Sequence, residues 1–448
     1  MRVNTTSMLL AMVLTVTAYV AKAQVPEYNF TLKEALDYGL ENSLSIRQAV
    51  LDQEQAEAKV GEVRSSGLPQ VTGEGQFQNF PNLPTQLLPG EIIGQPGTQI
   101  PVQFGTNYNV SGGIKATQLL YNQQFFTGLH AAKSSGELYS KMRLKSEEDV
   151  IYQVSTAYYQ VLELQAQVGV LQSNVARLKQ LESMMQVQYE NDIITQTDLG
   201  RLRVNRSNLE TGLQSLLSGL EQQTNYLKLL MGMPMEAKLT LVAPEDLEEV
   251  TLTALQLDKQ VPVEMEILAS QQELTELNVQ SIKAGYFPTL ALFGQQSWQA
   301  QRNEFNFFDG DQPWFQQTVV GLQLQVPIFD GLSKHHRIQQ AQIDQEKLRV
   351  QQTTVERQLD MQYANARQQL TNSMASVAAQ RDNRELAKQV HAQTQMLYKE
   401  QVVGLTDLLE AEQALREAES MYYRELLKFR RSELDLMKAQ GQLNQITQ

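Results

Sequence analysis

An internal duplication constrains the fold of this chain more than any other feature of the sequence. Three short motifs of the first half recur in the second half in the same order. The pairs are Leu68-Pro69 with Phe287-Pro288, Gly113 with Gly321, and Thr197-Asp198-Leu199 with Thr406-Asp407-Leu408. Their spacing is nearly constant, at roughly 210 to 220 residues, which is typical of a repeated structural unit. The sequence therefore predicts two copies of one unit, residues 24–243 and 244–448, each with the order helix, strand, loop, strand, long helix, turn, helix.

Residues 1–23 have the pattern of a signal peptide. Arg2 precedes the apolar stretch of residues 8–21, and Ala21 and Ala23 supply the small side chains that signal peptidase requires, so cleavage is expected after Ala23. Beyond this segment the chain has no apolar run of about 18 residues or more, which argues against a membrane-spanning helix in the mature protein. We expect an exported protein.

Charge and cysteine content exclude several classes of function. The formal net charge of the 448 residues is −13, and binding to phosphate backbones needs a basic surface, so we expect no nucleic acid partner. The chain has no cysteine, which excludes disulfides, thiol chemistry and a lipid anchor on an N-terminal cysteine.

Two long stretches predict helices of unusual length. No proline interrupts residues 123–191 or residues 333–402, and a helix of about 70 residues would extend roughly 100 Å. Apolar residues in the first stretch follow a heptad seam from Val150 to Leu178, and Leu408, Leu415 and Tyr422 begin a second seam in the last helix. Seams of this kind pair helices into coiled coils, so each half should end in a long helical hairpin.

Four short segments predict membrane β-strands. Residues 70–78, 108–120 and 318–328 alternate apolar and polar side chains, and residues 289–298 do so less regularly; Val320, Leu322 and Leu324, for example, oppose Gln323 and Gln325. An open sheet of so few strands would leave backbone groups unpaired in lipid, so several copies are needed to close a barrel. Two copies would give about eight strands with a filled interior, whereas three would give about twelve strands around water. The predicted fold is therefore mixed α and β: a long α-helical coiled-coil barrel, plus four transmembrane strands per protomer that form a twelve-stranded barrel in a homotrimer.

Several motifs, in order along the mature chain, resemble the TolC-type outer-membrane efflux protein family. The segments that carry the resemblance are Phe30-Thr31-Leu32-Lys33-Glu34-Ala35-Leu36, Leu68-Pro69, Phe287-Pro288, Val326-Pro327-Ile328-Phe329-Asp330-Gly331, and the whole turn Gly404-Leu405-Thr406-Asp407-Leu408-Leu409-Glu410-Ala411. The resemblance implies a trimeric channel in the outer membrane of a Gram-negative bacterium, in contact with its lipid, with a helical tunnel extending into the periplasm. It also implies a passive exit duct for a tripartite efflux or type I secretion system, energised by an inner-membrane transporter through a periplasmic adaptor protein.

The resemblance also suggests site residues. Asp407 and Glu410 lie three residues apart, hence on one helix face, where the family places acidic rings at the periplasmic entrance; Asp407 also suits a helix-capping role. Asp198 and Tyr398 match positions that join neighbouring helix pairs in the closed state of family members, although packing alone would also account for Tyr398. The family's arginine near this pair is absent, and Val402 is among the residues found there instead.

No pattern in the sequence predicts an enzyme, a cofactor or a metal site. The adjacent His335 and His336 point to different helix faces and lie between Lys334 and Arg337, which favours a basic cluster facing solvent or lipid headgroups. Phosphate-binding loops and hydrolase motifs are absent. The alternative function is a periplasmic adaptor or a structural coiled-coil protein, although an adaptor would normally have one helical hairpin rather than two.

Overall fold

The computed structural model describes residues 27–94, 96–244, 247–250 and 260–446. The predicted signal peptide and its cleavage site at Ala23 lie outside this range. The chain divides into two compact units. The first comprises Met1–Val50, Met142–Met265 and Thr354–Gln448, and the second comprises Leu51–Lys141 and Glu266–Thr353.

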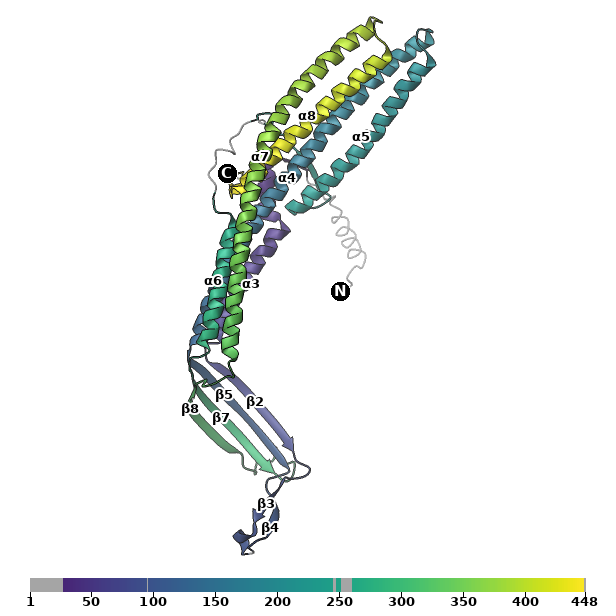
Figure 1. The fold of residues 1–448 in the computed structure, drawn as a ribbon. Coiled ribbons are helices and arrows are strands. Elements are labelled where there is room, and N and C mark those ends of the chain that lie inside the picture. Colours follow the sequence, from purple (N-terminus) through teal and green to yellow (C-terminus); the bar gives the residue numbers. More distant parts are fainter. Residues whose placement is uncertain (1–26, 95, 245–246, 251–259, 447–448) are drawn as a thin grey trace, which may run out of the picture. The chain divides into compact units, whose positions relative to one another are not determined.

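The second unit contains an antiparallel sheet of four strands in the order β2-β5-β7-β8 (Figure 1). The strands are β2 (Gln70–Asn79), β5 (Tyr108–Asn122), β7 (Thr289–Arg302) and β8 (Phe315–Gln325). All four were predicted from the alternation of side chains, with different bounds. The predicted end of the last strand at residue 328 is wrong, because β8 stops before Pro327, which has no amide hydrogen for a strand ladder.

Helices lead into the first strand of each half. These are α3 (Leu44–Ser65), which crosses from the first unit into the second, and α6 (Val263–Ala284). A proline follows shortly after each helix, and β2 and β7 begin directly after Pro69 and Pro288. The loop between β2 and β5 contains a hairpin that the sequence did not predict, formed by β3 (Thr85–Pro89) and β4 (Gln99–Gln103) with a 3₁₀ turn, η1 (Gly90–Ile93), between them.

The two glycines that mark the duplication both lie where a side chain would not fit. A Cβ atom at Gly113 on β5 would be 2.8 Å from the carbonyl oxygen of Gln296 on β7. A Cβ atom at Gly321 on β8 would be 2.9 Å from the ring of Phe293, which lies over this glycine from β7. Close approach between strands therefore explains why glycine occurs at both positions.

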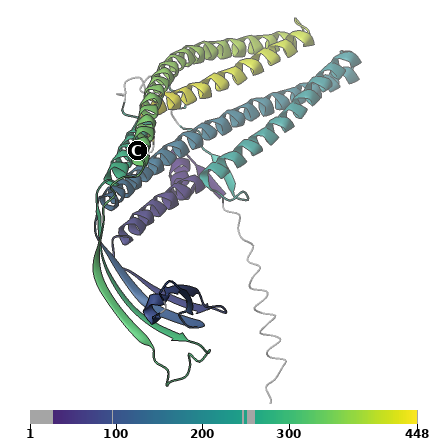
Figure 2. The ribbon, with the colours of Figure 1, turned by 60° about the horizontal axis from the view of Figure 1, so that its bottom comes forward.

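The first unit contains the greater part of two helical hairpins, seen from two sides in Figures 1 and 2. In one, α4 (Gln123–Glu190) is followed by α5 (Gln196–Met231), and in the other α7 (Ser333–Lys399) is followed by α8 (Leu405–Ala439). The predicted ranges of the two long helices are confirmed to within three residues at each end. None of the helices that the structure describes has the length and apolar character needed to cross a bilayer.

The predicted heptad seams form much of the core of these hairpins. On α4, Val154, Val161 and Leu178 are buried, whereas Leu164 and Leu171 are partly exposed. On α8 all five seam residues from Leu408 to Leu436 are buried. The seams therefore bury the faces that the spacing predicted.

A second, smaller sheet was not predicted. It consists of β1 (Glu27–Phe30), paired in parallel with β6 (Lys238–Leu241). Between β1 and the hairpins, α2 (Leu32–Asn42) begins at Thr31, whose hydroxyl and backbone form a capping box with Glu34. The hydroxyl of Tyr158 on α4 donates a hydrogen bond to the carbonyl oxygen of Val242 and also lies 3.2 Å from the carbonyl oxygen of Phe30, at the ends of this sheet. A 3₁₀ turn, η3 (Leu443–Ile446), follows α8.

Candidate functional site

The tips of the two hairpins are structural copies of each other. Asp192 follows α4 and Gln401 follows α7, and both have left-handed backbone conformations with φ of 58° and 60°. In each tip the amide of the following residue donates a hydrogen bond to a carbonyl oxygen in the last turn of the preceding helix. Ile193 donates to Gln188 and Val402 donates to Leu397, both at 2.9 Å. This is the hydrogen-bond pattern of a Schellman helix end. The duplication predicted from sequence thus extends to the backbone of the turns.

An aspartate is the third residue of the next helix in each hairpin. Asp407 of α8 accepts a hydrogen bond from the amide of Gly404 at 2.9 Å. The capping role considered for Asp407 is therefore present. In the other tip Thr195 caps α5: its hydroxyl accepts from the amide of Asp198 at 3.2 Å and donates to the Asp198 carboxylate at 2.6 Å.

Tyr398 lies in an apolar cluster that joins the two tips. The buried members of the cluster are Leu178, Leu181, Met185, Leu199, Leu202, Leu405 and Leu408, and Tyr398 packs against them. Burial raises the pKa of the Tyr398 hydroxyl, and the nearby carboxylate of Asp198 raises it further. The structure thus brings Asp198 and Tyr398 close together, but within the described part of the chain no hydrogen bond joins them.

Asp407 and Glu410 both lie in the first two turns of α8, and both side chains are exposed. Their spacing places them on one helix face, as the sequence predicted. Neither is part of a buried ion pair, so both carboxylates are available to act on ions in the surrounding water.

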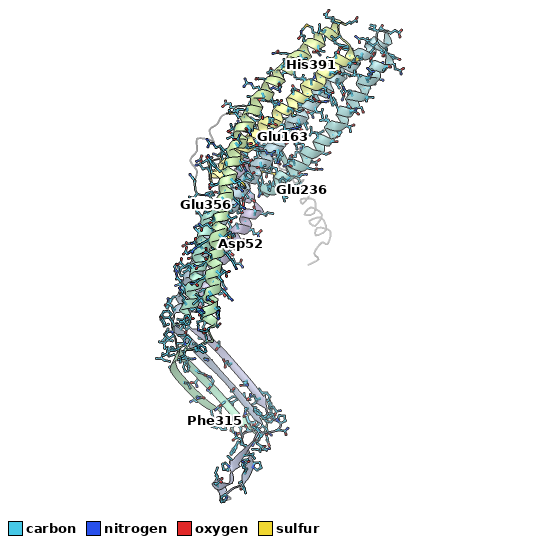
Figure 3. All side chains as sticks on the ribbon, viewed as in Figure 1. Asp52, Glu163, Glu236, Phe315, Glu356 and His391 are labelled. Carbon is cyan, nitrogen blue, oxygen red and sulfur yellow. The ribbon has the colours of Figure 1, made fainter. Side chains whose placement is uncertain are left out.

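A buried polar cluster near the tips was missed by the sequence analysis. His391, shown on α7 in Figure 3, lies 2.7 Å from the carboxylate of Glu412 on α8. Asn174 and Arg177 of α4 reach the same carboxylate. The sequence signal that could have identified Glu412 is its position directly after Ala411, which belongs to the apolar seam of α8.

The basic segment after β8 contacts neighbouring polar and aromatic side chains. Lys334 donates to Asp330 at 2.9 Å and lies over the ring of Tyr286, and His336 contacts Gln339. Among the residues that the structure describes, no group of three or more histidine and acidic side chains is suited to hold a metal ion.

The four-stranded sheet has two chemically different faces. The strand register places the exposed side chains of Val71, Ile114, Val320, Leu322 and Leu324 on one face. An exposed apolar surface of this extent marks an interaction site in a water-soluble protein and a lipid contact in a membrane protein.

The opposite face of the sheet is polar and contains many glutamines. Thr72, Lys115 and Gln295 form one row across the strands, and Glu74 and Ser297 belong to the next row. Glu74 and Lys115 are the charged side chains that the four strands contribute to this face. The negative charge of Glu74 and the positive charge of Lys115 cancel within one chain.

A sheet with a lipid-compatible face and a water-compatible face, in a chain that also forms two long hairpins, defines a channel subunit. Residues 264–442 match the family described as outer membrane efflux protein. The predicted resemblance to TolC-type outer-membrane efflux proteins is confirmed by this match.

Solved structures show the same fold along almost the whole chain. A structure of CusC, from work on folding and transmembrane channel formation, aligns with a TM-score of 0.72 and 16% identity over 92% of each chain. The outer membrane protein VceC of Vibrio cholerae aligns with a TM-score of 0.69 and 14% identity, over 92% of this chain and 96% of VceC. The open state of the Neisseria gonorrhoeae MtrE outer membrane channel aligns with a TM-score of 0.69 and 18% identity, over 93% of this chain and 90% of MtrE. No curated protein sequence matches the chain.

These comparisons confirm the predicted fold class. The description of the matched family supports an efflux channel of the outer membrane.

Proposed function

We propose that this chain forms a homotrimer in the outer membrane of a Gram-negative bacterium, with its helical hairpins in the periplasm. The trimer is a passive exit duct for a tripartite efflux or type I secretion system. A periplasmic adaptor protein and an inner-membrane transporter deliver the cargo, and the transporter supplies the energy, because a water-filled duct performs no bond chemistry. The two repeats, residues 24–243 and 244–448, each supply two of the four strands and one hairpin.

The four-stranded sheet is the single observation that carries this proposal. Its edge strands β2 and β8 have no partner strand within the described residues, and backbone groups left unpaired in lipid cost several kcal/mol each. Pairing β8 of one chain with β2 of the next removes both edges, and about twelve strands leave room for water inside. The apolar face then meets lipid and the polar face lines the lumen.

The hairpin tips are the proposed periplasmic entrance. Three copies of Asp407 and Glu410 would surround the opening with carboxylates, which attract cations and repel anions. Asp198 and Tyr398 are proposed to help hold the tips together, through the packing of the Tyr398 ring and the proximity of the two side chains.

The alternative function is that of a periplasmic adaptor or structural coiled-coil protein. It does not account for the exposed apolar face of the sheet. A gel experiment separates the two functions. A closed barrel trimer resists detergent until it is boiled, so the unboiled protein should migrate as a compact trimer and the boiled protein as a monomer. A purified chain that is monomeric and soluble without detergent contradicts the channel.

Transport is tested in cells. Deleting the gene of the matching inner-membrane transporter should abolish export even when this protein is present and trimeric. Export that continues without any transporter contradicts a passive duct.

A further inference from the structure

Glu412 is a buried carboxylate that receives hydrogen-bond donors from two other helices. Asn174 Nδ2 and Arg177 Nε of α4 each lie 3.1 Å from Glu412 Oε2, and His391 Nε2 of α7 lies 2.7 Å from Glu412 Oε1. The side chains of Glu412 and His391 are 8% and 9% exposed. We refer to Asn174, Arg177, His391 and Glu412 as the Glu412 cluster.

The contacts in the cluster fix the role of each side chain. Arg177 carries a permanent positive charge and donates from Nε to the carboxylate of Glu412. An ionised carboxylate only accepts hydrogen bonds, so His391 donates from Nε2 and Asn174 donates from its amide nitrogen. Both oxygens of Glu412 are thereby satisfied, as a buried charge requires.

The cluster links the two hairpins as well as the two helices of one hairpin. Glu412 lies on α8, and two of its three partners lie on α4 of the other hairpin. The ion pairs between α4 and α5 are more exposed: the side chains of Lys179 and Glu210 are 57% and 36% exposed, and those of Arg206 and Glu182 are 26% and 19% exposed. Exposed pairs contribute little, whereas breaking a buried pair leaves an uncompensated charge. The Glu412 carboxylate, at 8% exposure, is thus more buried than the carboxylates of these pairs, and it joins one hairpin to the other.

A cavity beside the cluster lies between the same helices. It has a volume of about 170 Å³, and Arg177, Glu412, Tyr398 and Lys399 are among the residues that line it. Arg177 Nη2 is buried and has no hydrogen-bond partner. A polar cavity of this size has room for water, which would hydrate Arg177 and Glu412 as the helices separate. Closed and separated arrangements are thus both accessible to these side chains.

We infer that the Glu412 cluster is the contact that keeps the two hairpins of each chain together in the closed duct, with Glu412 and Arg177 as its positioning residues. This inference rests on the proposed function, since it concerns the entrance of the channel. The main closing contact is thereby assigned to residues that the sequence did not identify as candidates. Asp198 and Tyr398 then have a supporting role, because they approach each other without a hydrogen bond.

The test compares the full-length trimer and its variants in planar lipid bilayers. E412Q keeps the size of the side chain and removes its charge, and R177M removes the partner. Each should raise the leak conductance roughly tenfold or more, and the double variant should leak no more than the stronger single variant, because both act on one contact. E417Q is the matched control on the same helix, since Glu417 is exposed and contacts only Gln413 of its own helix; it should behave as wild type.

A covalent link provides the second measurement. The chain has no natural cysteine, so N174C/E412C introduces the only two thiols. This variant should leak until a short, cleavable thiol crosslinker joins α4 to α8, and cleavage of the linker should restore the leak. The single-cysteine variants should not respond to the reagent. Restored closure distinguishes a closing contact from a residue needed only for folding.

The outcomes separate this inference from the proposed function. If wild type and E417Q form channels but E412Q and R177M are no leakier, and the crosslink has no effect, the inference is overturned and the channel function stands. If the wild-type trimer forms no channel, the proposed function itself fails. Should E412Q not assemble, R177M and the N174C/E412C crosslink carry the same comparison; a leak of R177M equal to that of E417Q, with no effect of the crosslink, would overturn the inference.

Discussion

Asp198 and Asp407 occupy the same position in the two hairpin tips. Each is the third residue of the helix that follows its turn, and each carboxylate accepts a hydrogen bond that closes that turn. They differ in their surroundings, because Asp198 is half-buried beside Tyr398 and Asp407 is exposed. The two aspartates therefore occupy equivalent positions in two different environments, and they should respond differently to substitution.

Neutralising the proposed entrance ring should lower cation preference. D407N/E410Q removes six negative charges from a trimer, and Asn retains the ability to cap the helix. A charge near water contributes about 1 kcal/mol or less to a neighbouring ion, so the cation-to-anion permeability ratio should fall about two- to fivefold. The reversal potential across a bilayer in a KCl gradient measures this ratio, with E417Q as the control. An unchanged ratio would remove both residues from the entrance.

Substitutions at Asp198 and Tyr398 should have a smaller effect than those in the Glu412 cluster. Y398F keeps the ring that packs against the apolar cluster, and D198N keeps the cap, so either should raise the leak about two- to threefold. Y398A should exceed both, because it also removes packing at the joined tips. Single-channel recordings rank the three variants. A leak in Y398F as large as in E412Q would reverse the ranking.

Two neighbouring residues of β8 should differ sharply in their tolerance of charge. Leu322 is 66% exposed on the apolar face, and Lys at the middle of a bilayer costs about 2–4 kcal/mol. L322K should therefore reduce the yield of trimer in the outer membrane severalfold. Q323K, on the polar face, should assemble as wild type. Unboiled gels of membrane fractions give the yields, and equal yields would contradict the assignment of the two faces.

Glu163 of α4, labelled in Figure 3, should make stability depend on pH. Burial raises the pKa of this carboxyl above its ordinary value of 4.5, although Arg431 and Arg424 partly oppose the shift. Because the pKa of Glu163 is raised in the folded state, its protonated carboxyl contributes to the free energy of unfolding. The contribution is fully present at pH values below the unfolded pKa and is lost as the pH rises through the folded pKa.

E163Q should therefore be more stable than wild type at neutral pH, with a midpoint of thermal unfolding higher by about 1–3 °C. The Gln167 side chain, which donates to Glu163 at 3.0 Å, can still reach the new amide oxygen. The difference should vanish below about pH 4. Thermal melts of the trimer at several pH values give the comparison, and a difference that grows toward acid pH would contradict the raised pKa.

The sequence predicted elements whose signals are local. Proline-free stretches and heptad spacing located α4 and α7, and Pro69 and Pro288 located the starts of β2 and β7. The alternation of side chains located the strands and identified their faces. In each case the physical cause lies within a few neighbouring residues.

The features that were missed depend on residues far apart in the chain. Parallel pairing of β1 with β6 joins two four-residue strands that are too short to show a period. Glu412 meets Asn174 and Arg177 across more than two hundred positions, and His391 looked isolated because its partner is not at a metal-ligand spacing. Only packing of the hairpins creates these contacts, and heptad spacing does not specify which polar residues will meet.

The contact between Phe293 and Gly321 has a consequence for the bore of the proposed duct. The aromatic ring lies flat over the neighbouring strand because that strand offers no side chain there. Even a single methyl group at position 321 would lift the ring off the wall and turn it toward the path of the cargo. With three chains in the trimer, three rings would narrow the same cross-section. The clearance for passing molecules therefore depends on residue 321 being a glycine, whose side chain is a single hydrogen atom.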